Sequence, residues 1–259
     1  MKKRTAFISV ILSLIPIGQP LLIKTGVILS TKGLILSISE KAKAESATFY
    51  FDRAFEKAEK GDYYGAIFDY TKAIEINPND DYAFYNRGNA KRKLKDDYGA
   101  ISDYTKAIEI NPNFEYAYYN RGNAKDELKD YYGAISDYTK AIEIDPKYQD
   151  AYLNRGYAKH MIKDYEGAIN DFNKVLTIDK NDKIAYNNLA WTKRKINDNY
   201  GAIFDATKAI EIDPNYSNPY LNRGVAKENL GDMNGACDDW RKASSLGNES
   251  SAEWVRDQC

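Results

Sequence analysis

A Gly-Ala pair recurs six times in this chain at a constant spacing of 34 residues. The pairs are Gly65-Ala66, Gly99-Ala100, Gly133-Ala134, Gly167-Ala168, Gly201-Ala202 and Gly235-Ala236. A fixed period of roughly 20 to 50 residues indicates one supersecondary unit stacked on copies of itself, and 34 residues is the length of a helix-turn-helix unit. Stacked units bury a shared core between neighbours, so the number of repeats sets the size of the core. The period therefore predicts an all-α solenoid.

Alignment on the Gly-Ala pairs divides the chain into six repeats and a partial seventh. The repeats span residues 47–80, 81–114, 115–148, 149–182, 183–216 and 217–250, and residues 251–259 remain. In the second repeat, small and apolar residues recur at spacings of three to four on both sides of a polar break. This periodicity predicts two amphipathic helices of about 12 to 14 residues in each repeat. We expect the partial seventh unit to form a capping helix.

Helix-stop and helix-start residues recur in register with the period. One aspartate precedes each second helix, where its carboxylate can accept hydrogen bonds from the unpaired amides and favours the positive end of the helix dipole. These aspartates are Asp62, Asp96, Asp130, Asp164, Asp198 and Asp232. Proline follows the second helix in the repeats that end Asn77-Pro78, Asn111-Pro112, Asp145-Pro146 and Asp213-Pro214, and proline cannot continue a helix. Asp179-Lys180 is the internal exception.

Small and charged residues also recur at fixed positions of the repeat. Glycine or alanine occupies the eighth position, where a larger side chain would force the two helices apart. These residues are Gly88, Gly122, Gly156 and Gly224, with Ala54 and Ala190 in the other repeats. Arg87, Arg121, Arg155 and Arg223 recur with Asp103, Asp137, Asp171 and Asp239 in the second helix of the same repeat, which predicts an ion pair within the repeat. Repeat five departs from this pattern because Leu189 stands opposite Asp205.

The repeat resembles the tetratricopeptide repeat (TPR), of the kind found in bacteria. The resemblance covers residues 47–250 and rests on the 34-residue length, small residues at positions 8 and 20, alanine at 27, proline at 32 and an aromatic at position 4. The aromatics are Tyr50, Phe84, Tyr118, Tyr152, Tyr186 and Tyr220. It implies a right-handed superhelix of antiparallel helix pairs. Its first helices would line a concave groove that binds a protein or peptide.

The same resemblance assigns partner-binding residues to positions 2, 5, 9 and 12 of the first helices. They are Tyr82, Tyr85, Asn89, Arg92, Tyr116, Tyr119, Asn123, Leu153, Tyr157, His160, Trp191 and Arg194. Positions 12 and 13 add Asp126, Glu127 and Met161. Aromatic and arginine side chains are common interface anchors, so the row Tyr85, Tyr119, Tyr157 and Trp191 is the strongest part of this prediction.

Asparagines in the first helices bear on what kind of peptide the groove would bind. Some TPR proteins hold the C-terminal carboxylate of a partner with lysine, arginine and asparagine at set positions. Here Asn86, Asn89, Asn120 and Asn123 are present, but Tyr85 and Asp150 occupy the lysine positions. We therefore do not expect such a carboxylate clamp. The asparagines could still bond a peptide backbone, or serve the packing of the repeats.

Residues 1–44 do not share the period and are typical of an export signal. Three basic residues at 2–4 precede an uncharged stretch at 5–23, and Ala42-Lys43-Ala44 provides a small-residue cleavage site. The 19 residues from Thr5 to Ile23 are also just long enough to span a bilayer, so membrane attachment through residues 5–23 is the alternative to cleavage. Either reading places the repeats in the periplasm or an equivalent extracytoplasmic space. A cytoplasmic location is the least favoured.

Charge and side-chain chemistry exclude several classes of function. Removal of residues 1–44 leaves 30 basic and 37 acidic residues, a net charge near −7, which argues against nucleic acid as a partner. His160 is the single histidine, and the sequence contains no phosphate-binding glycine loop and no metal-binding cysteine motif. The acids stand at cap and surface positions of the repeat. We therefore expect no enzyme activity, no cofactor and no metal site.

The two cysteines, Cys237 and Cys259, lie in the last repeat and in the partial seventh unit. In an exported protein an even number of cysteines favours a disulfide, which would attach the capping helix to repeat six. Two separate thiols are the alternative.

Together these features predict a non-catalytic scaffold that binds a protein or peptide and assists the assembly or maintenance of an extracytoplasmic or membrane-associated complex. A carbohydrate-binding or cell-wall-binding module is the alternative, because a row of aromatic side chains also suits sugar rings.

Overall fold

The computed structural model describes residues 21–22, 28–29 and 31–259, with side chains described from residue 42 onward. The chain forms two compact units, Met1–Ala90 and Lys91–Cys259. The boundary falls inside helix α4 (Asp81–Lys93). Most of the predicted signal segment lies outside the described residues.

The first unit contains two short strands and a pair of packed helices. Strands β1 (Leu21–Leu22) and β2 (Ile28–Leu29) pair antiparallel. Helix α2 (Thr31–Glu59) packs against α3 (Tyr63–Ile76), and the expected cleavage site at residues 42–44 lies inside α2. Ala54, Ala66 and Tyr70 are buried between these two helices. Within the described ranges, no helix is both long and apolar enough to cross a membrane.

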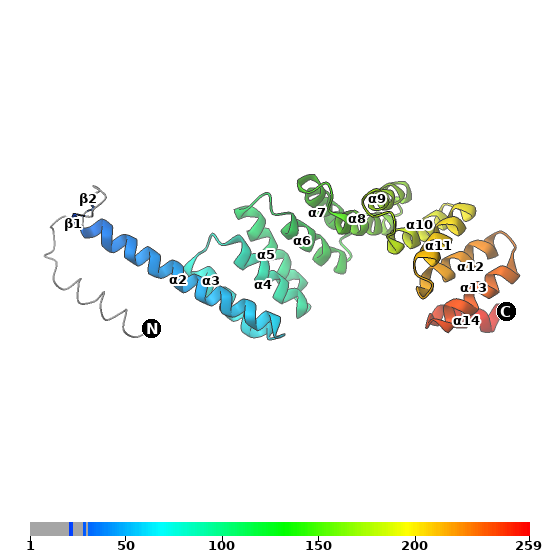
Figure 1. Ribbon diagram of the computed structural model, residues 1–259, viewed down its shortest axis with the longest axis horizontal. Helices are drawn as coiled ribbons and strands as arrows, with labels where there is room; N and C mark the ends of the chain where they lie inside the picture. The colour runs from blue at the N-terminus through cyan, green and yellow to red at the C-terminus, as the bar shows by residue number, and fades with distance from the viewer. Residues whose placement is uncertain (1–20, 23–27, 30) are drawn as a thin grey trace. The chain divides into compact units, whose positions relative to one another are not determined.

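The second unit is a continuous series of helices in which each packs on the next (Figure 1). They are α5 (Asp97–Ile110), α6 (Glu115–Glu127), α7 (Tyr131–Ile144), α8 (Gln149–Met161), α9 (Tyr165–Ile178), α10 (Lys183–Lys195), α11 (Asn199–Ile212), α12 (Ser217–Asn229), α13 (Met233–Ser245) and α14 (Glu249–Gln258). First helices also contact one another, α6 with α8, α8 with α10 and α10 with α12. The predicted α-solenoid of helix pairs is confirmed.

The recurring aspartate caps each second helix as predicted. In repeat three, the Gly133 amide donates to Asp130 Oδ1 at 3.0 Å. Equivalent bonds cap the second helix of each of the other repeats. Proline is not required to end the helix, because α9 ends at Ile178 with an extended Asp179 although Lys180 follows. The presence of Lys180 in place of proline therefore leaves the end of the helix as it is in the other repeats.

The turn between the two helices of each repeat contains one residue in the left-handed region. Glycine holds this place in repeats one and six, at Gly61 and Gly231. In the other repeats it is a non-glycine residue with φ of 62 to 67°, namely Lys95, Lys129, Lys163 and Asn197. A side chain with a Cβ is strained there, typically by about 1 to 2 kcal/mol.

Close approach of the two helices explains the glycine at position 8. A Cβ added to Gly122 would lie 2.7 Å from Cε1 of Tyr138, whose ring is fully buried against it. A Cβ on Gly156 would lie 2.6 Å from Cε1 of Phe172 in the same way. A Cβ at either glycine would therefore require the Tyr138 or Phe172 ring to shift.

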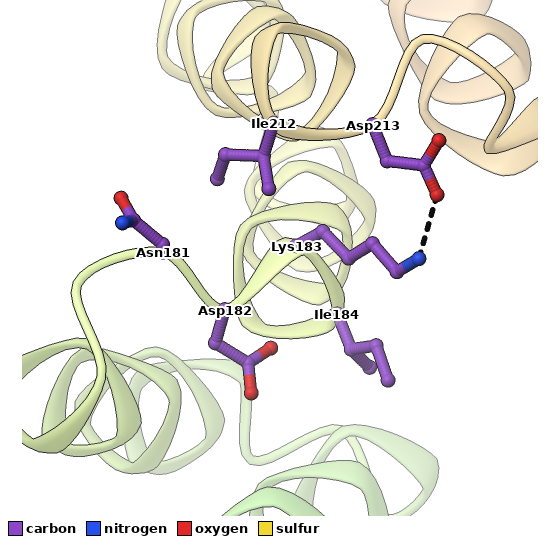
Figure 2. Close-up of a pocket in the computed structure, with 6 residues that line it drawn as sticks. All are labelled: Asn181, Asp182, Lys183, Ile184, Ile212 and Asp213. Carbon is purple, nitrogen blue, oxygen red and sulfur yellow. Dashed lines mark hydrogen bonds and ion pairs between the residues drawn. The ribbon is translucent and has the colours of Figure 1, made fainter.

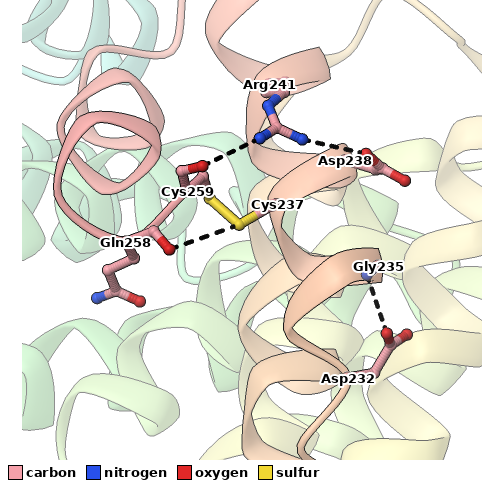
Figure 3. The surroundings of a disulfide bond; sticks show 7 residues. All are labelled: Asp232, Gly235, Cys237, Asp238, Arg241, Gln258 and Cys259. Carbon is pink, nitrogen blue, oxygen red and sulfur yellow. Dashed lines mark hydrogen bonds and ion pairs between the residues drawn. A yellow bond between two sulfur atoms is a disulfide. The ribbon is translucent and has the colours of Figure 1, made fainter.

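A disulfide attaches the last helix to repeat six. Cys237 on α13 is bonded to Cys259, with Cα atoms 5.7 Å apart (Figure 3). The Arg241 guanidinium on α13 also donates to the Cys259 carbonyl oxygen at 3.3 Å. Trp254 of α14 packs edge-on against buried Trp240, with ring centroids 5.1 Å apart. Helix α14 thus covers the apolar end of repeat six.

Candidate binding face

Buried ion pairs fix the two helices of each repeat relative to each other. In repeat three, Arg121 donates to Asp137 through Nε at 2.9 Å and Nη2 at 2.7 Å, and Lys125 Nζ lies 2.8 Å from the same carboxylate. Asp137 is 4% exposed, so its charge is compensated inside the protein. We call this arrangement the helix joint. Repeats four and six repeat it with Arg155, Lys159 and Asp171, and with Arg223, Lys227 and Asp239.

The helix joint also links neighbouring repeats. Arg121 Nη1 donates to Thr105 Oγ1 of the preceding repeat at 3.0 Å, and its guanidinium lies over the Tyr118 ring at 5.5 Å. The Arg121 guanidinium thus contacts Asp137, Thr105 and Tyr118 of the protein itself, and its role is structural. The predicted ion pairs are therefore confirmed in repeats three, four and six, and Arg53 forms the same kind of pair with Asp69 in the first unit.

Repeat five has a simpler joint, as its sequence predicts. Leu189 is buried against Ala168 and Phe172 of the preceding repeat. Asp205 keeps one cation, Lys193, whose Nζ lies 2.7 Å from Oδ2. Lys193 is the single cation that the described residues place against this carboxylate, whereas Asp137 has two. Burial raises the pKa of Asp205 despite the opposing effect of Lys193.

The side of helices α6, α8 and α10 that lies opposite the helix joints carries the predicted partner-binding residues of these helices. We call this surface, together with Arg92 at the end of α4, the first-helix face. Asparagines bond one another across it. Asn154 Nδ2 of α8 donates to Asn123 Oδ1 at 2.9 Å and to the Tyr119 hydroxyl at 3.0 Å, and the Tyr138 hydroxyl donates to the same Asn123 oxygen at 2.8 Å.

This network gives Asn123 and Tyr119 a structural role. Arg92 Nη1 and Asn123 Nδ2 make longer contacts with Asn120 Oδ1, both at 3.5 Å. In repeats five and six, Asn222 Nδ2 donates to Asn187 Oδ1 at 2.9 Å. Side chains that bond each other across repeats are poorly placed to bond a peptide backbone. The packing role of these asparagines is therefore the one that the geometry supports.

The predicted aromatic row divides into two groups. Tyr119 packs against Tyr148 and Tyr138, with ring centroids 4.8 and 5.9 Å away. Tyr157 stacks on Trp191 instead, at 6.0 Å and an interplanar angle of 28°. Tyr157 is 38% exposed and Trp191 is partly exposed. These two rings form the aromatic surface of the face.

The buried His160 ring packs against the Trp191 ring of this surface. His160 is only 5% exposed, its ring stacks on Trp191 with centroids 3.4 Å apart, and Nδ1 lies 2.9 Å from Thr192 Oγ1. Burial, followed by the positive charges of Lys195 and Arg194, lowers the pKa of His160 to about 4, so the ring is neutral near pH 7. The prediction that His160 itself contacts a partner does not fit this burial. Its position between two helices buries the side chain.

Charged groups on either side of the aromatic surface lack partners. Asp126 Oδ1 is buried and accepts no hydrogen bond within the described part of the chain. Burial, and then the charge of Glu127, raise the pKa of Asp126 to about 6. Arg194 is partly buried and makes no side-chain hydrogen bond or ion pair with any residue that the structure describes. Burial lowers the pKa of Arg194, and Glu228 opposes the shift.

The remaining predicted residues are distributed along the chain. Leu153 packs against the core of α9 and α10 and is half-buried. Tyr116 is 50% exposed and meets Tyr148 edge-on at 5.7 Å. In the first unit, Tyr82 is exposed, while Tyr85 and Asn89 are half-buried.

Asn154 and Tyr138 are the members of the network that our sequence prediction did not include. Asn154 belongs to an Asn-Arg-Gly triplet that recurs at residues 86–88, 120–122, 154–156 and 222–224, and this recurrence is the sequence signal for it. Tyr138 belongs to a second helix and gave no indication of reaching this face.

A separate pocket of about 470 Å³ lies beside the start of α10 and the end of α11 (Figure 2). Partly exposed Ile184 and Ile212 line it, and Lys183 extends toward Asp213 with Nζ 2.6 Å from Oδ2. Asp182 is also engaged, since it accepts from the Ala185 amide and from Gln149 Nε2. Because these charged groups already have partners, the pocket is a weaker candidate than the first-helix face.

The described residues contain no group of three or more histidine, cysteine, aspartate or glutamate side chains that could hold a metal ion. The chemistry of the face is that of recognition: two adjacent aromatic rings and uncompensated charges of both signs.

Comparison with known proteins agrees with the helix-pair architecture. Four family models match, each described as a tetratricopeptide or TPR repeat, over residues 82–114 and 115–148, 56–95, 137–170 and 184–216. A search of curated protein sequences gives no match.

Several solved structures share the fold. A crystal structure of MamA is 26% identical, with 64% of this chain and 96% of that chain covered and a TM-score of 0.59. YrrB, described as a TPR protein with an unusual peptide-binding site, is 21% identical over 72% of this chain and 97% of that chain, with a TM-score of 0.62. PilF of Pseudomonas aeruginosa is 18% identical over 83% and 99%, with a TM-score of 0.67. The 34-residue period, the packed helix pairs and these matches together show that the chain belongs to the tetratricopeptide repeat family.

Proposed function

We propose that this protein is a non-catalytic scaffold that binds a segment of another protein on the first-helix face of its second unit. The observation that carries the proposal is the stacked pair Tyr157 and Trp191, which remains accessible between unpaired charges on a rigid row of helices. Aromatic side chains on rigid elements are frequent anchors of protein interfaces. The peptide-binding site described for YrrB, a protein of the same fold, supports the same use of the fold.

The test is recovery of partners from the native cell. Full-length tagged protein is purified with its partners, in parallel with a variant carrying Tyr157→Ala and Trp191→Ala. The matched control carries Tyr98→Ala and Tyr132→Ala, which removes two tyrosines of the second helices that are 77% and 74% exposed. We expect the wild type and the control to recover the same partners and the Tyr157/Trp191 variant to lose them. Unchanged recovery with a folded Tyr157/Trp191 variant would contradict the proposal.

We propose further that the protein acts outside the cytoplasm or on a membrane surface, as part of a larger complex. The basic start, the apolar stretch and the small-residue site in residues 1–44 support this location. N-terminal sequencing of the purified protein tests it. A start at Glu45 demonstrates cleavage, an intact N-terminus in the membrane fraction demonstrates anchoring, and an intact N-terminus in the cytosol contradicts export. Retention on purified cell wall instead of proteins would favour carbohydrate binding.

A further inference from the structure

Three successive repeats present a negative, a neutral and a positive residue at the same position. Position 12 of the repeat is Asp126 in α6, His160 in α8 and Arg194 in α10. Since α6 contacts α8 and α8 contacts α10, these residues follow one another along the first-helix face. A ligand confined to these three repeats meets a negative charge at one end and a positive charge at the other, while Arg92 and Glu228 hold the same position in the repeats before and after them.

The negative end is a carboxylate with no internal partner. Asp126 makes no side-chain hydrogen bond or ion pair among the described residues, although Lys125 beside it in sequence is 2.8 Å from Asp137. Burial and then the charge of Asp126 raise the pKa of Tyr157, which places this carboxylate near the aromatic surface. A cationic side chain at Asp126 would supply the missing hydrogen bond, and it could also lie against the Tyr157 ring.

The positive end is the guanidinium of Arg194. It is partly removed from water without receiving an acceptor from the described residues. Arginine presents a rigid fork of donors that matches a carboxylate. Glu228 is close enough to influence the charge but forms no ion pair with Arg194, so the fork remains available.

The middle of the row is apolar. Neutral, buried His160 holds Trp191 against its own ring, and Tyr157 stacks beside it. An apolar or aromatic side chain would pack on these rings with little loss of their conformational freedom, because they are already held in place.

We propose that the first-helix face recognises a polypeptide segment of mixed charge. A basic side chain of the segment pairs with Asp126, and an acidic side chain pairs with Arg194. An apolar or aromatic side chain between them packs on Tyr157 and Trp191. Packed helices lie about 8 to 10 Å apart and an extended chain advances about 3.3 Å per residue, so the two charged side chains are separated by roughly five or six residues. This inference rests on the proposed function and specifies its partner.

The experiment selects peptides from a displayed library of random 12-residue sequences on the immobilised full-length protein. The proteins compared are the wild type, Asp126→Asn, Arg194→Gln and the control Lys140→Gln, which changes an exposed charge on second helix α7. We expect wild type and control to enrich peptides with a basic and an acidic residue at the stated spacing. Asp126→Asn should lose the basic preference alone, and Arg194→Gln the acidic preference alone.

Affinity then quantifies the two contacts. For a selected peptide, fluorescence anisotropy should show about tenfold weaker binding to each variant, as expected for loss of one charge-assisted contact. A peptide whose basic residue is replaced by glutamine should bind wild type and Asp126→Asn equally. Circular dichroism establishes that the variants keep their helix content. Arg194→Lys, which keeps the positive charge, should retain the preference for an acidic residue.

The outcomes separate this inference from the proposed function. Enrichment without a charge preference, or a preference that survives in both variants, overturns the mixed-charge assignment and leaves peptide binding standing. If no peptide is enriched and the Tyr157/Trp191 variant still recovers every cellular partner, the proposed function fails and this inference fails with it.

Discussion

Asp126 and Asp137 lie in the same repeat and have opposite surroundings. Asp137 is buried in the helix joint with Arg121 and Lys125 against its carboxylate. Asp126, the residue next to Lys125, projects onto the first-helix face with a buried oxygen that accepts no hydrogen bond from the described residues. The helix joint compensates its charges internally, and the first-helix face leaves them uncompensated. The comparison suggests that one repeat separates the charges that hold it together from those that remain for a partner.

The carboxylate of Asp205 in repeat five is intermediate between Asp126 and Asp137 in the number of cations that contact it. The joint of this repeat has lost the arginine, and Asp205 retains a single cation. The carboxylate is as deeply buried as that of Asp137, so the difference lies in the partners and not in the depth. Identical substitutions at these aspartates therefore test the comparison directly.

The largest effect is expected for Asp137→Asn. This change leaves Arg121 and Lys125 without their shared acceptor, and breaking a buried charge pair typically costs about 3 to 5 kcal/mol. The measurement is the urea dependence of the helical circular dichroism signal. Glu143→Gln is the control, because that exposed partner of Lys140 should contribute less than about 1 kcal/mol. A loss below about 1 kcal/mol for Asp137→Asn would mean that the joint is not a main source of stability.

Asp126→Asn should have a smaller effect of opposite sign. The folded pKa of about 6 exceeds the ordinary value of 3.8, so ionisation of Asp126 costs the folded state free energy. Stability of the wild type is therefore lost as pH rises through the interval from 3.8 to about 6. We expect the variant to be more stable by about 1 to 2 kcal/mol at pH 7.5, after allowance for partial exposure.

The check on Asp126 is the difference in melting temperature between variant and wild type at two pH values. The gain should be present at pH 7.5 and nearly absent near pH 3.5, where Asp126 is neutral in the folded protein and mostly protonated in the unfolded chain. A gain of equal size at both pH values would show that it does not come from the charge.

Arg194→Gln should change stability by less than about 1 kcal/mol, since a partly buried cation without a partner contributes little. Its effect should be the same at pH 6 and pH 8, because arginine stays charged over that range. Arg121→Gln is the matched variant in the joint and should be clearly destabilising. Equal losses for the two arginines in thermal unfolding would remove the distinction between joint and face.

The smallest effect is expected for Asp205→Asn, within about 0.5 kcal/mol near pH 7. The pKa of Asp205 is raised, so its ionised form gains no net stability from folding, and the amide keeps the shape of the side chain. Urea unfolding beside Asp137→Asn provides the measurement. If both variants lose stability equally, a single lysine is enough to close the joint.

Features determined within one repeat could be predicted from the sequence. The Asp130 cap, the close contact at Gly122 and the pairing of Arg121 with Asp137 all depend on spacing within one helix pair, which periodicity fixes. The position of Tyr157 and Trp191 on the same face also follows from the period. These predictions needed no knowledge of how one repeat meets the next.

The sequence could not determine which side chains form hydrogen bonds or stack on one another between neighbouring repeats. Asn123 could face a peptide or Asn154, and only the packing of α6 on α8 decides between them. Likewise His160 occupies a position assigned to partner binding, yet Trp191 of the next repeat covers it. Asp126 differs from the aspartates of the helix joints because one of its carboxylate oxygens is buried and accepts no hydrogen bond from the described residues, and no local pattern encodes this.

The disulfide between Cys237 and Cys259 determines how the C-terminal end of the helical array can unfold. Terminal repeats of a stacked array separate first, since they have a neighbour on one side alone. With α14 attached to α13, the last helix pair can detach from α12 but cannot shed its final helix, as long as the bridge is oxidised. Release of α14 alone from α13 would therefore require reduction of the bridge, whereas detachment of the joined pair from α12 would not.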